Sequence, residues 1–269
     1  MTSGAFSVTR RVNAERIVVL GWPRAILLQL AHPLVAAGVS EHSSFRQGGF
    51  TAVARLHHTI RAMVALTFGD DQARTAALDG IRAIHRRVNG RLPAAAGIFP
   101  AGTPYSAEDP DLVLWVHATL LETIPLAYEH LVMPLSADER DAYCEEAAAI
   151  AIELGARPNE VPRTWADMNR YLDRMYASGA IVVSAQAREI GVAVLSPPFA
   201  ALVAPIAALN RLLTIGLLPD ALRREYEFEW SAARARRLTR AIAVLKVLHS
   251  ILPRRIRLWR EAYNCHPET

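Results

Sequence analysis

Four side chains on two neighbouring helical stretches could together perform redox chemistry at a metal. Arg55, His58 and Thr59 lie at positions i, i+3 and i+4, so a helix places a fixed cation, an imidazole and a hydroxyl on one face. His85 lies in the next helical stretch, beyond a turn at 68–71. One imidazole opposite a cation, a second imidazole and a hydroxyl is the set that an iron porphyrin with one protein ligand and a polar oxygen-binding side requires.

Two antiparallel helices joined at this turn would hold the four side chains in position. At about 1.5 Å of rise per residue, Thr59 lies about 15 Å and His85 about 20 Å from the turn. These heights allow both residues to face one pocket. The spacing also allows a second interpretation, because a single helical histidine is commonly a hydrogen-bonded core or surface residue.

Three further histidines are candidates for the same pocket. His32 precedes a proline, and His42 follows an apolar run, so either could approach the pocket or anchor a chain reversal through hydrogen bonds. His117 has apolar neighbours on a long helix. A hydrogen-bonded core imidazole is the first interpretation of His117, and pocket lining is the second.

The fold class predicted from the sequence is all-α, as a single-domain bundle of helices that encloses a pocket. The 269 residues are 52% apolar, which is enough for one large core. No stretch shows sustained alternation of apolar and polar residues between turn signals. Helical patterns predict one domain over 1–269, with a core at about 10–240 and a basic helical part at 220–260; the expected helices span 10–20, 24–31, 51–68, 71–89, 111–132, 136–154, 164–178 and 220–260. Asp70 or Asp71 is expected to cap the helix at 71–89, and capping boxes are expected at Ser106–Asp109 and Ser136–Glu139.

The charge distribution and the cysteines indicate which binding partners and which cellular compartment to expect. The formal net charge is +4, but acidic residues are interleaved with the basic ones and no nucleic-acid-binding pattern is present. The arginines of the last predicted helix are expected to form a solvated face; they are Arg234, Arg237, Arg240 and Arg257. Cys144 and Cys265 belong to no metal, disulfide or covalent haem pattern, and no secretory signal is recognisable. A cytoplasmic protein that does not bind nucleic acid is expected.

The most apolar stretch is 192–218, and prolines together with the pair Asn210 and Arg211 interrupt it. These interruptions argue against a spanning helix. The part from Phe199 to Leu218 could line a channel for a lipophilic substrate, or lie in a membrane interface as a peripheral contact. A pair of buried core helices is the third interpretation.

The sequence lacks the motifs of several other enzyme classes. The chain has no H-E-x-x-H, and none of its nine histidines has a glutamate three residues before it, so zinc proteases and di-iron bundles are disfavoured. G-x-S-x-G and Walker patterns are also absent. A porphyrin supplies four of its own ligands, so a single protein imidazole is enough for haem chemistry.

Four segments resemble one known family. They are Gly21 to Phe45, with the sequence GWPRAILLQLAHPLVAAGVSEHSSF, RLHHT at 55–59, IHRRVNG at 84–90 and DLVLWVHAT at 111–119. Together they are similar to the rubber oxygenase catalytic domain, which bacterial latex-clearing proteins share with a fungal oxygenase that shortens a farnesyl chain in mycophenolic acid biosynthesis. The resemblance covers roughly Arg10 to Arg240.

The resemblance implies an all-helical enzyme with non-covalent haem b that uses dioxygen to cleave isoprenoid double bonds to carbonyl products. His85 matches the axial haem ligand, and Arg55 and Thr59 match polar residues of the distal side. His58 stands where latex-clearing proteins have a lysine. A neutral imidazole binds iron more readily than an ammonium group, so His58 could be a sixth ligand or a proton donor. This change and the missing export signal argue against rubber itself as the substrate.

The sequence therefore predicts a haem b oxygenase for a lipophilic, isoprenoid-like substrate. Arg55, His58 and Thr59 are the expected catalytic residues. The expected cofactor contacts are His85, Arg55 and His58, with His42 and His117 as further candidates. The alternative is a non-catalytic helical protein that binds haem or a lipophilic molecule.

Overall fold

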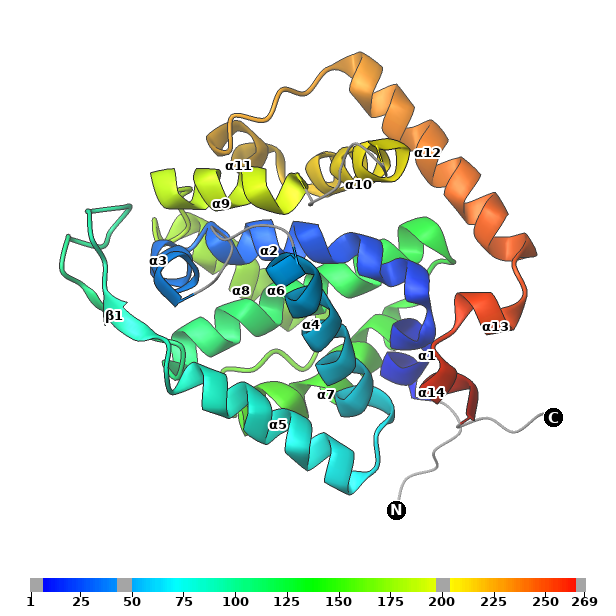
Figure 1. Ribbon diagram of the computed structural model, residues 1–269, viewed down its shortest axis with the longest axis horizontal. Helices are drawn as coiled ribbons and strands as arrows, with labels where there is room; N and C mark the ends of the chain where they lie inside the picture. The colour runs from blue at the N-terminus through cyan, green and yellow to red at the C-terminus, as the bar shows by residue number, and fades with distance from the viewer. Residues whose placement is uncertain (1–6, 43–49, 197–203, 265–269) are drawn as a thin grey trace.

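The computed structural model describes residues 7–42, 50–196 and 204–264, and the side chains of 7–42, 58–196 and 204–262. Within these residues the chain is a single all-α unit with one small sheet, as predicted (Figure 1). Its first half contains α1 (Val8–Ala14), the 3₁₀ helix η1 (Arg16–Gly21), α2 (Trp22–Leu30), α3 (Pro33–His42), α4 (Phe50–Phe68), α5 (Asp71–His85), β1 (Asn89–Arg91), β2 (Pro104–Ser106) and α6 (Pro110–Leu131). Its second half contains α7 (Ala137–Glu153), α8 (Trp165–Ala177), α9 (Ala185–Leu195), α10 (Ala204–Leu217), α11 (Asp220–Glu225), α12 (Ala232–Ile251), α13 (Arg254–Arg257) and α14 (Arg260–Asn264).

Helix α6 forms the centre of the core. It packs against η1, α2, α7, α8 and α12, and Trp115 on it is fully buried. The Trp115 indole N–H donates to the backbone carbonyl of Gln29 at 3.3 Å, which satisfies the polar atom of this ring. On α2, the buried guanidinium of Arg24 contacts Glu122 at 2.5 and 2.7 Å and the backbone carbonyl of Leu217 at 2.6 Å. This charge therefore links α2, α6 and α10.

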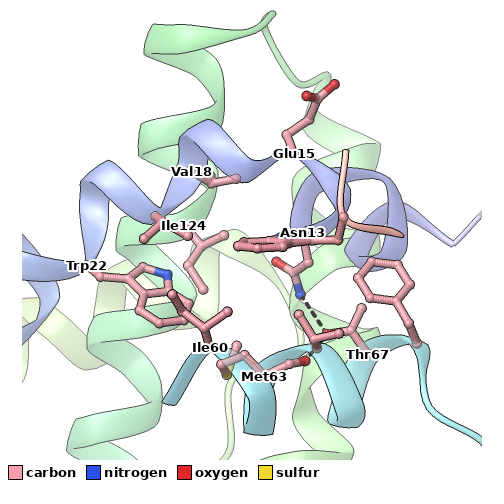
Figure 2. Close-up of a pocket in the computed structure, with 12 residues that line it drawn as sticks. Asn13, Glu15, Val18, Trp22, Ile60, Met63, Thr67 and Ile124 are labelled. Atoms are coloured by element: carbon pink, nitrogen blue, oxygen red, sulfur yellow. Dashed lines mark hydrogen bonds between the residues drawn. The ribbon is translucent and has the colours of Figure 1, made fainter. Parts of the chain in front are cut away.

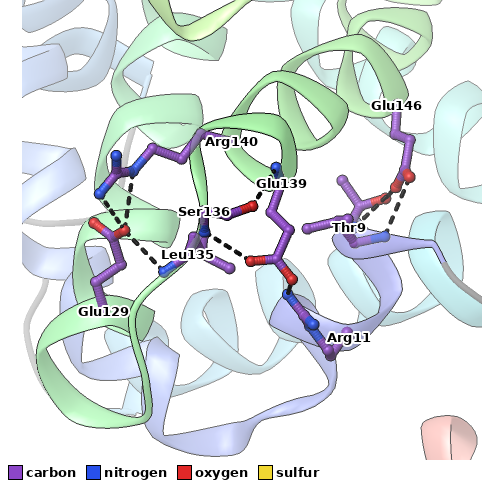
Figure 3. Close-up of polar contacts among 9 residues, drawn as sticks. Thr9, Arg11, Glu129, Leu135, Ser136, Glu139, Arg140 and Glu146 are labelled. Atoms are coloured by element: carbon purple, nitrogen blue, oxygen red, sulfur yellow. Dashed lines mark hydrogen bonds and ion pairs between the residues drawn. The ribbon is translucent and has the colours of Figure 1, made fainter.

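Local capping chemistry explains where α7 begins and how α1 attaches to it (Figure 3). The Ser136 hydroxyl accepts from the backbone N–H of Glu139 at 3.1 Å, and the Glu139 carboxylate accepts from the backbone N–H of Ser136 at 2.7 Å. This capping box was predicted from the sequence and is confirmed. The same carboxylate pairs with Arg11 at 2.5 Å, and these contacts lower the pKa of Glu139. One glutamate thus caps α7 and attaches α1.

The two short strands correct the expectation of a chain without sheet. β1 and β2 pair antiparallel, with Gly90 opposite Tyr105. Three-residue strands are too short to show an alternating pattern, which explains why the sequence did not reveal them. The predicted helix over 71–89 is also too long, because α5 ends at His85 and the chain continues through a turn into β1. His85 is therefore the last residue of α5.

The start of α6 and the apolar stretch 192–218 differ in detail from prediction. Asp109 caps α6 by accepting from the backbone N–H of Asp111 at 2.9 Å, whereas Ser106, the expected cap, lies in β2.

The apolar stretch forms the end of α9 and the whole of α10, while Phe199 lies outside the described residues. In the described part of the chain, no single helix is long and apolar enough to cross a bilayer; Arg16–Leu30 with Pro33–His42 would do so only as a pair bent by 109°.

The C-terminal part returns to the beginning of the chain. Helix α12 runs along the outside of the molecule, and α13 and α14 follow it to α1 (Figure 1). The backbone N–H of Trp259 donates to the carbonyl of Ala14 at 3.0 Å. The buried side chains of His249 and Glu15 meet at 2.8 Å between Nε2 and Oε2. The two ends of the described chain are thus joined by backbone and side-chain contacts.

Candidate functional site

Helices α4 and α5 form the predicted antiparallel pair. They pack side by side, and the turn between them contains Gly69 and Asp70 (Figure 1). The Asp70 carboxylate accepts from the backbone N–H of Ala73 at 2.8 Å, so it caps α5 as the sequence indicates. This hairpin carries Arg55, His58 and Thr59 on α4 and His85 on α5.

The structure describes only part of the motif on α4. The side chains of His58 and Thr59 are exposed, on the turn of α4 that precedes its C-terminal half. The side chain of Arg55 lies outside the described residues, although its backbone belongs to α4. The convergence of Arg55, His58 and Thr59 with His85 on one pocket therefore stays a prediction.

His85 ends α5 and is half-buried. Burial lowers the pKa of its imidazole, and the nearby charge of Glu108 opposes this shift more weakly. Among the described residues, no group forms a hydrogen bond with this ring. A neutral imidazole without a hydrogen-bond partner has a lone pair available for a metal. His85 is therefore chemically suited to the role that the sequence predicts.

The hairpin of β1 and β2 begins four residues after His85, and two side chains and one glycine that were not predicted as site residues support it. The Tyr105 hydroxyl donates to the Glu41 carboxylate at 2.5 Å, and burial together with this carboxylate raises the pKa of Tyr105. A Cβ at Gly90 would lie 2.5 Å from the Tyr105 oxygen, so only glycine fits there. Gly90 belongs to the segment 84–90, which was the available signal for this contact.

His117 lies on α6, where burial alone lowers its pKa to about 4. Its Nε2 is buried and has no hydrogen-bond partner among the described residues. The described residues therefore do not supply the hydrogen bond that the first interpretation from the sequence, a hydrogen-bonded core imidazole, requires at this nitrogen, and both interpretations stay predictions. Leaving a buried polar atom unpaired costs about 1–3 kcal/mol. A bound group at Nε2 would remove that cost, which favours the second interpretation, pocket lining.

His42 and His32 both anchor chain reversals. The Nε2 of His42 hydrogen-bonds to the backbone carbonyl of Asn89 at 2.9 Å and so holds the end of α3 against β1. The Nδ1 of His32 accepts from the backbone N–H of Leu34 at 3.3 Å, and burial lowers the pKa of His32 to about 4. These contacts support the structural interpretation of both rings, and cofactor contact by His42 stays a prediction.

A narrow pocket begins one residue after Thr59 (Figure 2). Ile60 and Met63 of α4 form one wall, and Val18, Trp22 and Ile124 from η1, α2 and α6 form others. Its cavity has a volume of about 20 Å³, which holds one water molecule and no macrocycle. The pocket does not include the candidate histidines.

The haem expected from the sequence can be tested against the donors that are present. Haem needs one axial protein ligand, and His85 is a neutral, half-buried imidazole without a hydrogen-bond partner among the described groups. His117 adds a buried Nε2 that lacks a partner within the same residues. In donor chemistry these residues fit haem b. In the part of the chain that the structure describes, no cluster of three or more His, Cys, Asp or Glu side chains could hold a bare metal ion.

Comparison with known proteins identifies the family. The family model described as "ER-bound oxygenase mpaB/B'/Rubber oxygenase, catalytic domain" matches residues 9–247. Among curated proteins, the uncharacterized proteins Mb2261 of Mycobacterium bovis and Rv2237 of Mycobacterium tuberculosis are each 27% identical to the chain over 236 residues, covering 86% of this chain and 88% of the relative. No solved structure matches the chain. The chain therefore belongs to the mpaB and rubber oxygenase catalytic-domain family, and by family it is an oxygenase.

Proposed function

We propose that the protein is a haem b-dependent oxygenase that cleaves or oxidises a double bond of a lipophilic, isoprenoid-like substrate with dioxygen. Membership of the oxygenase family over residues 9–247 supports the reaction class. The observation that supports haem as the cofactor is the state of the His85 imidazole. This ring is half-buried, its pKa is lowered, and it has no hydrogen-bond partner in the described residues.

His85 would hold the haem iron through its neutral ring. Because its pKa lies below the ordinary value, the ring stays unprotonated at neutral pH and does not have to lose a proton to bind. When bound, haem supplies an iron that activates dioxygen. His85 is the last residue of α5, and the chain continues from it through a turn into β1.

Arg55 and Thr59 would donate hydrogen bonds to dioxygen. A guanidinium keeps its charge at all physiological pH values, and fixed donors stabilise negative charge that develops on oxygen. The two residues are one turn apart on α4, so they lie on the same face of the helix and can point toward the same site. His58 would either be a second protein ligand of the haem or donate a proton.

The substrate would enter beside the apolar stretch from Phe199 to Leu218. Helix α10 supplies most of this stretch, and its Ile206 side chain is 64% exposed although it is apolar. Such a side chain is more stable against a lipophilic molecule than in water. A cytoplasmic location, with peripheral contact to membranes as the source of the substrate, is part of this proposal.

Oxygen consumption tests the proposed function. Purified protein with farnesol as the isoprenoid probe is expected to consume dioxygen and to form carbonyl products, with one dioxygen molecule per cleaved double bond because each oxygen atom ends in one carbonyl group. Product analysis by mass spectrometry checks this balance. A coloured protein whose spectrum changes without oxygen consumption would be a haem sensor or carrier. A colourless protein that retains a hydrophobic molecule would be a binding protein, and either result contradicts the proposal.

The role of His58 can be read from the spin state of the iron. If His58 is the sixth ligand, His58→Ala is expected to shift the ferric protein from low spin toward high spin, because a strong axial ligand is lost. Visible absorption and electron paramagnetic resonance measure this shift. An unchanged spin state rejects ligation and leaves the proton-donor role. Thr59→Val is the matched control, since it changes the adjacent side chain without removing a nitrogen ligand.

A further inference from the structure

The outer face of α12 and α13 exposes aliphatic side chains. Helix α12 packs against α10 and α6, and Leu238, Ile242, Leu245 and His249 lie on its packed side. On α12 outside this packed side, and at Leu252 and Ile256 beyond it, large aliphatic residues are 40–72% exposed; they are Val244, Val247, Leu248, Ile251, Leu252 and Ile256. The spacing of the α12 members places them in one stripe along the helix. In Figure 1, this helix lies at the edge of the molecule.

The same segment carries only positive charge. No aspartate or glutamate occurs between Glu229 and Glu261, while nine basic residues do: Arg234, Arg236, Arg237, Arg240, Lys246, Arg254, Arg255, Arg257 and Arg260. Arg234 pairs with Glu229 and Arg257 approaches Glu15, so these two arginines are not simply solvated as the sequence suggested. Arg240, Arg254 and Arg255 are exposed and flank the apolar stripe at its two ends.

We propose that this surface docks on an anionic lipid bilayer. We call it the basic apolar face and define it by Arg240, Val244, Val247, Leu248, Ile251, Arg254, Arg255 and Ile256. The aliphatic side chains enter the boundary between headgroups and acyl chains, and the flanking arginines contact lipid phosphates. Helices that lie in a membrane interface combine the same two features. The docking does not depend on haem or on catalysis.

The charge pattern argues against a second copy of the chain as the occupant. In a two-fold symmetric dimer the same patch meets itself, so Arg240, Arg254 and Arg255 would face identical cations. No acidic residue of 230–260 is available to compensate this repulsion. Anionic lipids supply the opposite charge. The exposed apolar residues are aliphatic and not aromatic, which also disfavours single-stranded nucleic acid, whose bases stack on aromatic rings.

Helix α12, which carries most of this face, packs closely against α10. A Cβ at Gly216 would lie 2.6 Å from Leu238 Cδ2, so glycine at this position allows α10 and α12 to pack closely. Helix α10 belongs to the apolar stretch through which the substrate is proposed to enter. Docking through α12 would therefore bring that stretch close to the bilayer.

Co-sedimentation with vesicles tests the docking. The full chain is expected to bind vesicles of phosphatidylcholine with 25% phosphatidylglycerol, and to bind pure phosphatidylcholine vesicles at least about tenfold more weakly, since anionic lipid attracts basic segments. The double variant Arg254→Gln/Arg255→Gln should bind about 25-fold more weakly, at about fivefold per arginine. Val247→Asp/Ile251→Asp should lose measurable binding, and Ile98→Asp, an equally exposed change in the β1–β2 connection, should bind like wild type.

Three results would overturn the proposal. They are no binding to either vesicle, equal binding to both vesicles, and wild-type binding by both double variants. A dimer in light scattering that Val247→Asp/Ile251→Asp dissociates would instead assign the face to a second copy. Circular dichroism verifies that each variant is folded. If the aspartate variant does not fold, the glutamine variant still decides, because Arg254 and Arg255 are exposed.

Discussion

The His85→Ala variant is expected to purify without its haem. Loss of residues that only orient a metal ligand costs about 10- to 100-fold in affinity, so removal of the ligand itself should cost at least about 100-fold. The Soret band should therefore disappear, or fall to the level of non-specific binding, while the helical circular dichroism signal remains. The ratio of Soret absorbance to protein absorbance measures this effect. Addition of free imidazole should restore part of the band, because it can occupy the vacated position.

His130→Ala provides the matched control. His130 is also a half-buried histidine whose pKa burial lowers, but it lies near the end of α6 and was not selected as a site residue. Its replacement should leave the haem content unchanged. Equal haem content in both variants would remove His85 from the site. Equal loss in both would point to a general loss of folding, which the circular dichroism spectra would show.

Acid is expected to destabilise the fold through two buried histidines. Burial lowers the pKa of His32 and of His117 from 6.5 to about 4. Between these values the unfolded chain binds protons that the folded chain excludes, so stability decreases as the pH falls below about 6.5. Each ring should reduce the free energy of unfolding by about 2 kcal/mol at pH 5 relative to pH 8, giving about 4 kcal/mol together. Urea unfolding at the two pH values measures this loss.

Replacement of one ring separates this effect from general acid sensitivity. His117→Phe keeps an aromatic side chain but cannot take up a proton, so its loss of stability between pH 8 and pH 5 should be about 2 kcal/mol smaller than that of wild type. His42→Phe is the control, since His42 is exposed. An identical pH dependence for wild type and His117→Phe would show that His117 is not a buried neutral ring.

The local features of the fold could be predicted from the sequence. The α4–α5 hairpin, the Asp70 cap, the capping box of Ser136 and Glu139 and the predominance of helices are confirmed. Each depends on side chains within a few residues of one another, so spacing and residue type are enough to predict it. The family was likewise predictable, because its motifs are contiguous segments.

The features that the sequence did not predict depend on contacts between distant residues. In the β1–β2 hairpin, the Tyr105 hydroxyl donates a hydrogen bond to Glu41 and packs against Gly90, where a Cβ would clash with it. These three residues are far apart in the sequence, so no short segment contains all of them. The unpaired Nε2 of His117 depends on which neighbours surround it on other helices. The arginines of α12 were predicted to form a solvated face, and Arg237 and Arg240 are exposed as predicted. Only the structure shows that large aliphatic residues of the same helix are exposed as well.

The visible spectrum of the purified wild-type protein, followed by pyridine haemochrome analysis, shows whether the protein binds haem b. One imidazole at the end of α5 is proposed to hold a non-covalent haem b. We expect a Soret band and a haemochrome of the b type, with about one haem per chain. A protein expressed with sufficient iron and haem precursor that shows no Soret band would contradict this expectation.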